Sequence, residues 1–339
     1  MTDVAIVGAG PAGLYLAHLL DQQGISYRIF DKAQHLGTKA CSGLYSPRIE
    51  EFVKLDPSWI DHRVSGALIR NNGTVIRAEK KNWHAYVVSR KKMQQGLIRQ
   101  WKIPIEQKQI ETLLIENNVC LKTRDETISA KLLVGADGSN SLVRRHFKVA
   151  VPETINGIIA LVPETNTGDK VELWVDETLK DGFYWKIPRG KQTEYGAMGT
   201  VQFSDLEKRF NLSTYEKEAA IIPLGLIPTA FNRTLLLGDA ACQVKPWSGG
   251  GVIFSFTCAK IAATTIANAL AENRFDEAFL KEQYDDVWKA GVGKTINIGL
   301  LFRGLYRDAS PEEITALFKA LTTTDLSALD MDFPDGFGF

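Results

Sequence analysis

One segment near the N-terminus constrains the fold more than any other. Residues 4–7 (Val-Ala-Ile-Val) form a short apolar run rich in β-branched residues, and residues 8–13 (Gly-Ala-Gly-Pro-Ala-Gly) follow directly in the pattern GxGxxG. A helical pattern of leucine and alanine comes next and stops near Gly24, and residues 27–30 form a second apolar strand that ends at Asp31. This order predicts a βαβ unit with parallel strands.

The residues of this turn have physical reasons to be where they are. Gly8 permits the tight turn, Gly10 lets the backbone approach a pyrophosphate, and Gly13 lets the helix pack closely on the strand. The helix N-terminus offers N–H groups and the positive end of its dipole to phosphates. Asp31 can accept hydrogen bonds from ribose hydroxyls. A glycine-rich turn without a ligand is the alternative, but strand, helix and terminal acid together favour dinucleotide binding, with contacts from Gly8, Gly10, Pro11, Ala12, Gly13, Asp31 and Lys32.

The rest of the chain alternates between parallel and antiparallel patterns. Two short strands flank Asn71-Asn72-Gly73, a hairpin signature, and a helix is expected over 90–101. Alternating strands fill 152–223, with a second hairpin at 183–188 and 194–203, before a parallel-type strand at 235–237 and a long apolar helix over 252–270. We expect an α/β fold with a Rossmann-type dinucleotide domain over 1–62, 89–150 and 231–272. An antiparallel-sheet substrate domain is expected over 63–88 and 151–230, followed by a C-terminal helical region over 273–339.

Two further glycine-containing turns follow apolar strands, at residues 135–138 (Gly-Ala-Asp-Gly) and 238–239 (Gly-Asp). Three such turns in this order, with antiparallel insertions between them, resemble the FAD-binding signature of p-hydroxybenzoate-hydroxylase-like flavoproteins. The resemblance implies that the first turn holds the ADP half of FAD, the second braces the pyrophosphate and the third reaches the ribityl chain. It adds these cofactor contacts: Arg90, Ala136, Asp137, Gly138, Gly238 and Asp239.

The loop at 246–251 (Pro-Trp-Ser-Gly-Gly-Gly) gives an independent reason to place a flat ring nearby. Its three consecutive glycines leave room for a ring to approach the backbone, and the helix that follows directs its N-terminus there. The helix dipole would favour negative charge on the N1–C2=O edge of a reduced flavin. An ordinary helix-capping loop is the alternative. The predicted cofactor contacts are Gly249, Gly250, Gly251 and Val252, and the predicted substrate contacts are Pro246 and Trp247.

Two motifs narrow the resemblance to the geranylgeranyl reductase family. Residues 39–44 (Lys-Ala-Cys-Ser-Gly-Leu) resemble that family's cysteine-containing loop, and residues 183–190 (Phe-Tyr-Trp-Lys-Ile-Pro-Arg-Gly) resemble its YxWxFPKG motif. The resemblance covers nearly the whole chain and implies FAD contacts at Ala40, Cys41, Ser42 and Gly43. It implies substrate contacts at Phe183, Tyr184 and Trp185, with Cys41, Tyr184 and Trp185 as candidate catalytic residues. The same segment lies near the WxWxIP pattern of flavin-dependent halogenases, but Phe183 replaces the first tryptophan.

The resemblance predicts an FAD-dependent oxidoreductase that saturates C=C bonds of prenyl (geranylgeranyl) chains in isoprenoid lipids. Reduced flavin would give hydride from N5, and Tyr184, Cys41, Tyr45 or water would give the proton. A flavin monooxygenase or halogenase of the same fold, or a non-catalytic prenyl-binding flavoprotein, are the alternatives. Only one GxGxxG is present, so NAD(P)H or a ferredoxin-type donor must visit the flavin transiently.

Composition limits the partners and the compartment. Lys+Arg and Asp+Glu both number 40, so net charge gives no general attraction to nucleic acid. The longest uncharged stretch contains three glycines and a proline, so we expect no membrane span, and no signal-peptide pattern is evident. We expect a cytoplasmic protein with free cysteines, no metal site and peripheral contact with the inner face of the membrane. The candidate contact residues are Leu300, Leu301, Phe302, Leu305 and Tyr306, with Arg303 and Arg307 alongside.

Overall fold

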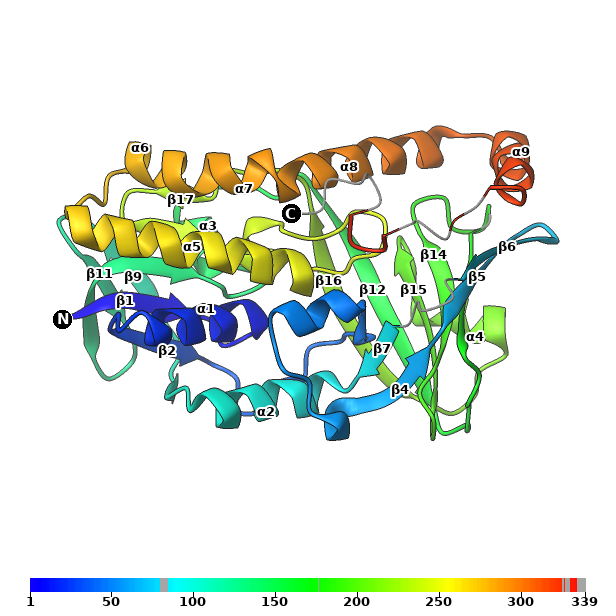
Figure 1. The fold of residues 1–339 in the computed structure, drawn as a ribbon, viewed down its shortest axis with the longest axis horizontal. Coiled ribbons are helices and arrows are strands. Elements are labelled where there is room, and N and C mark those ends of the chain that lie inside the picture. Colours follow the sequence, from blue (N-terminus) through cyan, green and yellow to red (C-terminus); the bar gives the residue numbers. More distant parts are fainter. Residues whose placement is uncertain (80–84, 176, 325, 327–329, 334–339) are drawn as a thin grey trace.

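The computed structural model describes residues 1–339 except 80–84, 176, 325, 327–329 and 334–339. Its described strands form an 8-stranded, a 7-stranded and a 3-stranded sheet (Figure 1). Helices lie along the 8-stranded sheet, and one long C-terminal helix runs from there toward the 7-stranded sheet (Figure 1). The fold therefore joins an α/β half to an antiparallel half.

The 8-stranded sheet has a parallel core in the order β18-β11-β1-β2-β8. Its strands are β1 (Thr2–Val7), β2 (Tyr27–Asp31), β8 (Ile105–Gln107), β11 (Thr127–Gly135) and β18 (Thr234–Leu236). Three strands join antiparallel: β9 (Thr112–Ile115), β10 (Val119–Lys122) and β17 (Ala230–Phe231). Since the carboxyl ends of parallel strands meet at one edge, the three glycine turns that follow β1, β11 and β18 are brought together there.

Alternation along β1 divides its side chains between the two faces of the sheet. Val4 and Ile6 pack with helices α1 (Pro11–Gln22), α2 (Arg90–Trp101) and α5 (Val252–Glu272) on one face. Ala5 and Val7 pack on the other face with α3 (Leu142–His146) and the β9–β10 hairpin. Helices α1 and α5 lie side by side (Figure 1). Helix α5 is long and apolar enough to cross a membrane, but 67% of its most apolar window is buried inside the protein, as expected for a core helix.

The 7-stranded sheet is antiparallel except where β13 pairs with β5. In spatial order it contains β16 (Glu216–Leu224), β12 (Glu153–Val162), β15 (Thr193–Gly199), β14 (Phe183–Pro188), β13 (Lys170–Trp174), β5 (Gly66–Asn71) and β6 (Thr74–Glu79). Both predicted hairpins are confirmed. The expected strand over 194–203 ends earlier, at Gly199. Thr200 donates from its backbone N–H and its hydroxyl to Asp181, and α4 (Phe203–Phe210) then begins.

Each face of this sheet carries its own apolar cluster. We call the face that carries Ile155, Ile159, Trp185 and Leu224 the inner face, because it packs against the 3-stranded sheet of β3 (Leu44–Tyr45), β4 (Ile60–Val64) and β7 (Ala85–Val88). The opposite, outer face is covered by α4.

The C-terminal region is helical as predicted. It contains α6 (Glu277–Leu280), a π-helical turn (Lys281–Asp285), α7 (Asp286–Ala290), α8 (Val292–Asp308) and α9 (Pro311–Leu321). Helix α9 packs on β6 through Ile314 and Phe318, which contact Ile76. The predicted α/β fold with an interleaved antiparallel sheet is confirmed. The division of the chain into a dinucleotide domain, a substrate domain and a C-terminal region, at the residue boundaries given above, remains a proposal.

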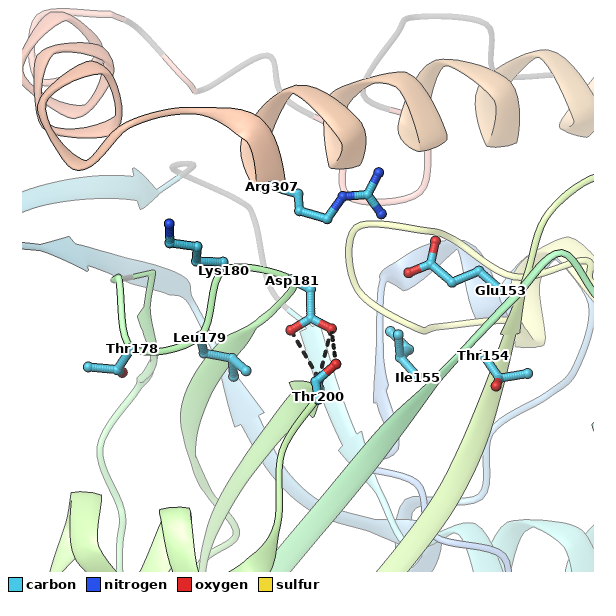
Figure 2. Close-up of a pocket in the computed structure, with 9 residues that line it drawn as sticks. All are labelled: Glu153, Thr154, Ile155, Thr178, Leu179, Lys180, Asp181, Thr200 and Arg307. Atoms are coloured by element: carbon cyan, nitrogen blue, oxygen red, sulfur yellow. Dashed lines mark hydrogen bonds between the residues drawn. The ribbon is translucent and has the colours of Figure 1, made fainter.

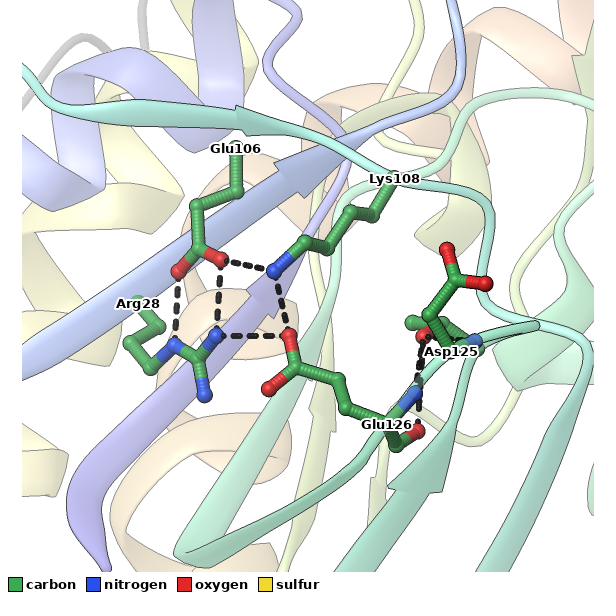
Figure 3. A network of polar contacts seen from close by, with 6 residues as sticks. Arg28, Glu106, Lys108, Asp125 and Glu126 are labelled. Carbon is green, nitrogen blue, oxygen red and sulfur yellow. Dashed lines mark hydrogen bonds and ion pairs between the residues drawn. The ribbon is translucent and has the colours of Figure 1, made fainter.

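An ion-pair network fastens the edge of the 8-stranded sheet (Figure 3). Arg28 on β2 donates to both carboxylate oxygens of Glu106 on β8, at 2.6 and 2.7 Å, and to Glu126 at 3.0 Å. Lys108 donates to the same two carboxylates. The Arg28 guanidinium is the main reason that the pKa of Glu106 falls to about 2. The network therefore joins β2 and β8 to the turn between β10 and β11.

Candidate functional site

The first glycine turn combines a tight backbone with an open approach. A Cβ at Gly8, where φ is +107°, would lie 2.3 Å from the Ala136 carbonyl oxygen, and one at Gly13 would lie 2.0 Å from the Gly8 carbonyl oxygen. A Cβ at Gly10 would meet no atom within 4 Å. Pro11 and Ala12 begin helix α1 directly after it. The turn is thus closed on its protein side and open at the helix N-terminus, which fits a pyrophosphate.

Asp31 at the end of β2 supports this turn. One carboxylate oxygen accepts from the Ala9 backbone N–H and the other from the Ala33 N–H, both at 2.8 Å. Each carboxylate oxygen can accept a further bond, so a ribose hydroxyl remains compatible with Asp31. Lys32 is exposed beside it.

The second turn is beside the first, but its acid has another partner. Ala136 contacts Gly8 and Gly13, and Gly138, with φ at +81°, faces open space. Asp137 accepts from the Ser141 hydroxyl at 2.5 Å and from the Leu142 N–H at 2.6 Å. Its carboxylate therefore caps helix α3, and burial raises its pKa. Three residues were predicted here. Ala136 faces the first turn, Gly138 faces open space, and the Asp137 carboxylate bonds α3 instead.

The third turn packs against the first. A Cβ at Gly238 would lie 3.0 Å from the Ala12 Cβ, and one at Gly251 would lie 3.4 Å from an Asp239 carboxylate oxygen. Asp239 forms an ion pair with Lys39. Predicted residues from all three turns and from the glycine loop are therefore adjacent in space.

A support behind the third turn was not predicted. The Gly238 N–H donates to Gln243 at 2.8 Å, Gln243 donates to the Tyr284 hydroxyl at 2.9 Å, and Tyr284 donates to the Leu236 carbonyl at 2.7 Å. All three links are buried. Tyr284 comes from the π-helical turn, so the C-terminal region positions the cofactor turn.

The glycine loop is folded around Lys245. The Lys245 N–H donates to the Gly250 carbonyl, and the Gly249 N–H donates to the Lys245 carbonyl. The Lys245 ammonium donates to Asp332 at 2.9 Å, which ties the loop to the C-terminal segment. Gly251 and Val252 then open helix α5 with no side-chain cap at Gly251. Pro246 is buried, and Trp247 lies against Gly299 of α8, so this pair packs against the C-terminal helix.

The cysteine loop lies between these turns and the inner face. The Cys41 sulfur is 3.7 Å from the Tyr45 hydroxyl and accepts from the Gly43 N–H at 3.4 Å. A Cβ at Gly43 would lie 1.9 Å from the Val88 carbonyl oxygen, and Ala40 packs on the inner-face cluster. Arg90 interacts electrostatically with Tyr45, Cys41 and Asp239, which joins this loop to the third turn.

Gln94, one helical turn after Arg90, was missed by the sequence reasoning. Its side-chain amide donates to the Ala9 carbonyl at 2.6 Å, and its oxygen accepts from the Arg90 Nε at 3.4 Å. Helix α2 therefore connects the first glycine turn with the cysteine loop. Gln94 is four residues after Arg90 in a predicted helix, so the sequence indicates that both side chains lie on the same face of that helix.

The aromatic motif divides between the two faces of the sheet. Phe183 and Trp185 lie on the inner face with ring centroids 5.7 Å apart. Tyr184 lies on the outer face near Phe210 and under the Arg209 guanidinium. The expectation that Tyr184 joins Cys41 and Trp185 in one site is therefore wrong, because successive strand side chains point to opposite faces.

A buried polar group anchors the inner face to the cysteine loop. The Trp185 indole donates to Glu194 at 2.8 Å, and Arg189 donates to the other Glu194 oxygen at 2.6 Å. Arg189 also donates to the Ser42 carbonyl at 2.7 Å and to Asp61 at 3.2 Å. Glu194 is fully buried and only 9% of the Arg189 side chain is exposed. Neither Glu194 nor Asp61 was predicted.

A separate polar pocket of about 560 Å³ lies beneath the end of α8 (Figure 2). It is lined by Glu153, Thr154, Ile155, Thr178, Leu179, Lys180, Asp181, Thr200 and Arg307. None of the predicted cofactor, substrate or catalytic residues lines it, although Arg307, a candidate membrane-contact residue, does. Its two carboxylates are held by buried Arg303. We therefore place the candidate site at the glycine turns, the cysteine loop and the inner face.

Comparison with known proteins agrees with this geometry. A model described as an NAD(P)-binding Rossmann-like domain matches residues 6–65, and one described as an FAD binding domain matches residues 114–223. The chain is 27% identical to digeranylgeranylglycerophospholipid reductase 2 of Methanococcoides burtonii over 97% of this chain and 90% of that protein. It is 28% identical to the protein of the same name from Methanopyrus kandleri, over 96% and 92%.

Solved structures share the fold. A geranylgeranyl bacteriochlorophyll reductase-like protein of Thermoplasma acidophilum superposes with a TM-score of 0.88 at 18% identity, covering 98% of this chain and 94% of that one. The halogenase PltM in complex with phloroglucinol and FAD superposes with a TM-score of 0.73 at 15% identity, covering 98% and 87%.

Proposed function

We propose that this chain, a member of the geranylgeranyl reductase family of FAD-dependent oxidoreductases, saturates C=C bonds in the prenyl chains of an isoprenoid lipid. The observation that carries the proposal is the position of the cysteine loop. It lies between three glycine turns suited to FAD and an apolar sheet face suited to a hydrocarbon chain. The curated relatives are named for reduction of a digeranylgeranyl glycerophospholipid, which supports that class of substrate.

The residues present fit FAD. The space at Gly10 and Gly138 would admit phosphate oxygens, and Asp31 would hold the ribose. Asp239 and the uncapped start of α5 would face the ribityl chain and the flavin ring. When bound and reduced, FAD supplies hydride from N5. The protein's own contribution is to hold the ring, exclude water and align the alkene.

The inner face supplies the apolar wall for the substrate. Phe183 and Trp185 present aromatic rings on it, and Ile155, Ile159 and Leu224 continue the surface toward α8. An isolated alkene offers no polar group for recognition, so apolar contact must position it. Cys41 and Ala40 border this surface, and we propose contact with substrate rather than redox chemistry as the role of Cys41.

We propose that the electron donor is transient. The chain has one GxGxxG turn, which the FAD site uses, so NAD(P)H or a ferredoxin-type protein would reduce the flavin during a brief encounter.

We also propose a cytoplasmic protein that contacts the inner face of a membrane peripherally through α8. Leu301, Phe302 and Leu305 are 62%, 65% and 70% exposed on one side of this helix, and Leu300, which precedes them, packs inward on the inner-face cluster. Arg303, predicted to accompany them, is instead buried and paired with Glu153. Arg307 is half-exposed, but it points away from the leucines into the pocket beneath α8 (Figure 2).

The test is an incubation of the flavin-loaded protein with digeranylgeranyl glycerophospholipid and a chemical reductant, under nitrogen and under air. We expect products heavier by two hydrogens per reduced bond in both atmospheres. Oxygenated or halogenated products formed only under air would support the alternative enzyme class instead. Lipid binding without any product would support a non-catalytic prenyl-binding flavoprotein.

A further inference from the structure

One row of residues crosses the inner face over four strands. Trp185 on β14 is opposite Gly196 on β15, Gly196 is opposite Ile159 on β12, and Ile159 is opposite Glu218 on β16. Residues directly opposite on neighbouring strands share a face, so Glu218 lies on the same surface as the Trp185 indole. A Cβ at Gly196 would be 2.2 Å from that indole, so the ring lies over the Gly196 backbone. Glu218 is thus a carboxyl group at the end of an otherwise apolar row.

The cysteine loop lies near both ends of the row, close to Glu218 on β16 and to the hairpin that carries Trp185. The Cys41 backbone N–H lies near enough to the Glu218 carboxyl group to lower its pKa, and the Ser42 carbonyl accepts from Arg189 at 2.7 Å. Consecutive residues of the loop therefore lie next to β16 on one side and are bonded to the β14–β15 hairpin on the other. The face between Trp185 and Glu218 lies next to the loop that the flavin turns position.

The charges around Glu218 favour its neutral form. Burial is the main reason that its pKa is raised, and the nearby Glu194 and Glu216 carboxylates raise it further. Arg189 and the Cys41 N–H act in the opposite direction, but Arg189 already pairs with Glu194 and Asp61, and Asp61 is shared with Lys92. One buried guanidinium cannot neutralise every carboxylate around it, which favours the protonated form of Glu218.

We propose that Glu218 is the proton donor of the reduction, an inference that rests on the proposed function. The alkene π bond breaks as one carbon takes hydride, with its electron pair, from reduced flavin. The other carbon takes the proton as the Glu218 O–H bond breaks. The flavin is oxidised by two electrons, the alkene is reduced by two, and the remaining carboxylate is reprotonated from solvent. Tyr184 cannot fill this role because it lies on the outer face.

The test compares Glu218→Gln with Glu216→Gln, a matched change at the exposed start of the same strand. We expect Glu218→Gln to retain FAD but to slow lipid-dependent oxidation of the reduced flavin under nitrogen about 100-fold or more, as for loss of a general acid. Glu216→Gln should stay within about twofold of the wild-type rate, because Glu216 contributes less than burial and Glu194 to the raised pKa of Glu218. Glu218→Asp should recover part of the rate, and wild-type turnover should fall as pH rises through the raised pKa of Glu218.

A second readout does not depend on turnover. Infrared difference spectra of the oxidised protein should be recorded between acidic and neutral pH. They should show a protonated-carboxyl band that persists to a higher pH than the titration of an exposed glutamate allows. The Glu218 part of this band should be lost in Glu218→Gln and kept in Glu216→Gln, whereas buried Asp137 contributes equally in both. A Glu218→Gln protein with wild-type turnover, or with the band intact, would overturn the assignment of Glu218 alone. A wild-type protein that never reduces the lipid would overturn the proposed function and this assignment together.

Discussion

The Arg189 guanidinium donates to the Ser42 backbone carbonyl at 2.7 Å, which fastens the aromatic hairpin of one sheet to the cysteine loop of the other half. Arg189 also balances Glu194, which is fully buried. This one side chain therefore sets both the stability of the contact between the halves and the position of Cys41 above the inner face.

Replacing Arg189 by Met should be strongly destabilising. Removing one partner of a buried ion pair leaves an uncompensated charge, here on Glu194, and typically costs about 3–5 kcal/mol. The free energy of unfolding from urea denaturation measures this loss. Adding Glu194→Gln to Arg189→Met should recover part of it, and a single variant as stable as wild type would refute the role given to Arg189.

The glycines of the first turn should respond differently to a side chain. Gly10→Val should fold normally but lose FAD, since its φ of −67° suits any residue and the added atoms would project into open space. Gly13→Val should destabilise the fold itself, because its Cβ would collide with the Gly8 carbonyl. Thermal unfolding and the flavin-to-protein absorbance ratio separate the two effects. A Gly10→Val protein with a full flavin complement would show that the turn is misassigned.

The two adjacent aromatic residues of β14 should have different effects on activity. Trp185→Ala should impair turnover of long prenyl substrates and leave FAD bound, because it removes a ring from the inner face. Tyr184→Phe should leave kcat within about twofold of wild type, since Tyr184 lies on the outer face. Steady-state kinetics on both variants decide this, and a large loss of kcat in Tyr184→Phe would contradict the assignment of faces.

Acid should weaken the edge of the 8-stranded sheet. The pKa of Glu106 is lowered from 4.5 to about 2 by Arg28, so its stabilising contribution is complete above pH 4.5 and is lost as pH falls toward 2. Melting temperatures measured from pH 6 to pH 3 should therefore fall less steeply in Glu106→Gln than in wild type. Glu111→Gln, at a nearby exposed position, should follow the wild-type slope.

The sequence predicts those elements well whose signals are local. The GxGxxG turn, the Asn-Gly hairpin and the long apolar helix each depend on residues close together in the chain, and the structure has all three. Helix α2 begins and ends where the pattern places it.

The supports of the site could not be predicted because they join distant segments. Gln243 donates to Tyr284 and Lys245 pairs with Asp332 only in the assembled fold. Glu218 likewise comes near Cys41 only when the sheets assemble. The wrong prediction for Tyr184 has a different cause. The resemblance supplied the motif as a unit, whereas strand alternation sends its middle residue to the other face. Asp137 similarly matches a cofactor motif, yet its carboxylate caps α3.

The most direct test of the account is a single turnover without oxygen. The flavin of the purified protein is reduced stoichiometrically, mixed with a prenylated glycerophospholipid under nitrogen and followed by its absorbance. The account predicts that the oxidised flavin spectrum returns in proportion to the double bonds that are saturated, and that a fully saturated lipid produces no change. A reduced flavin that remains stable with the unsaturated lipid and is oxidised only when oxygen is admitted would contradict it.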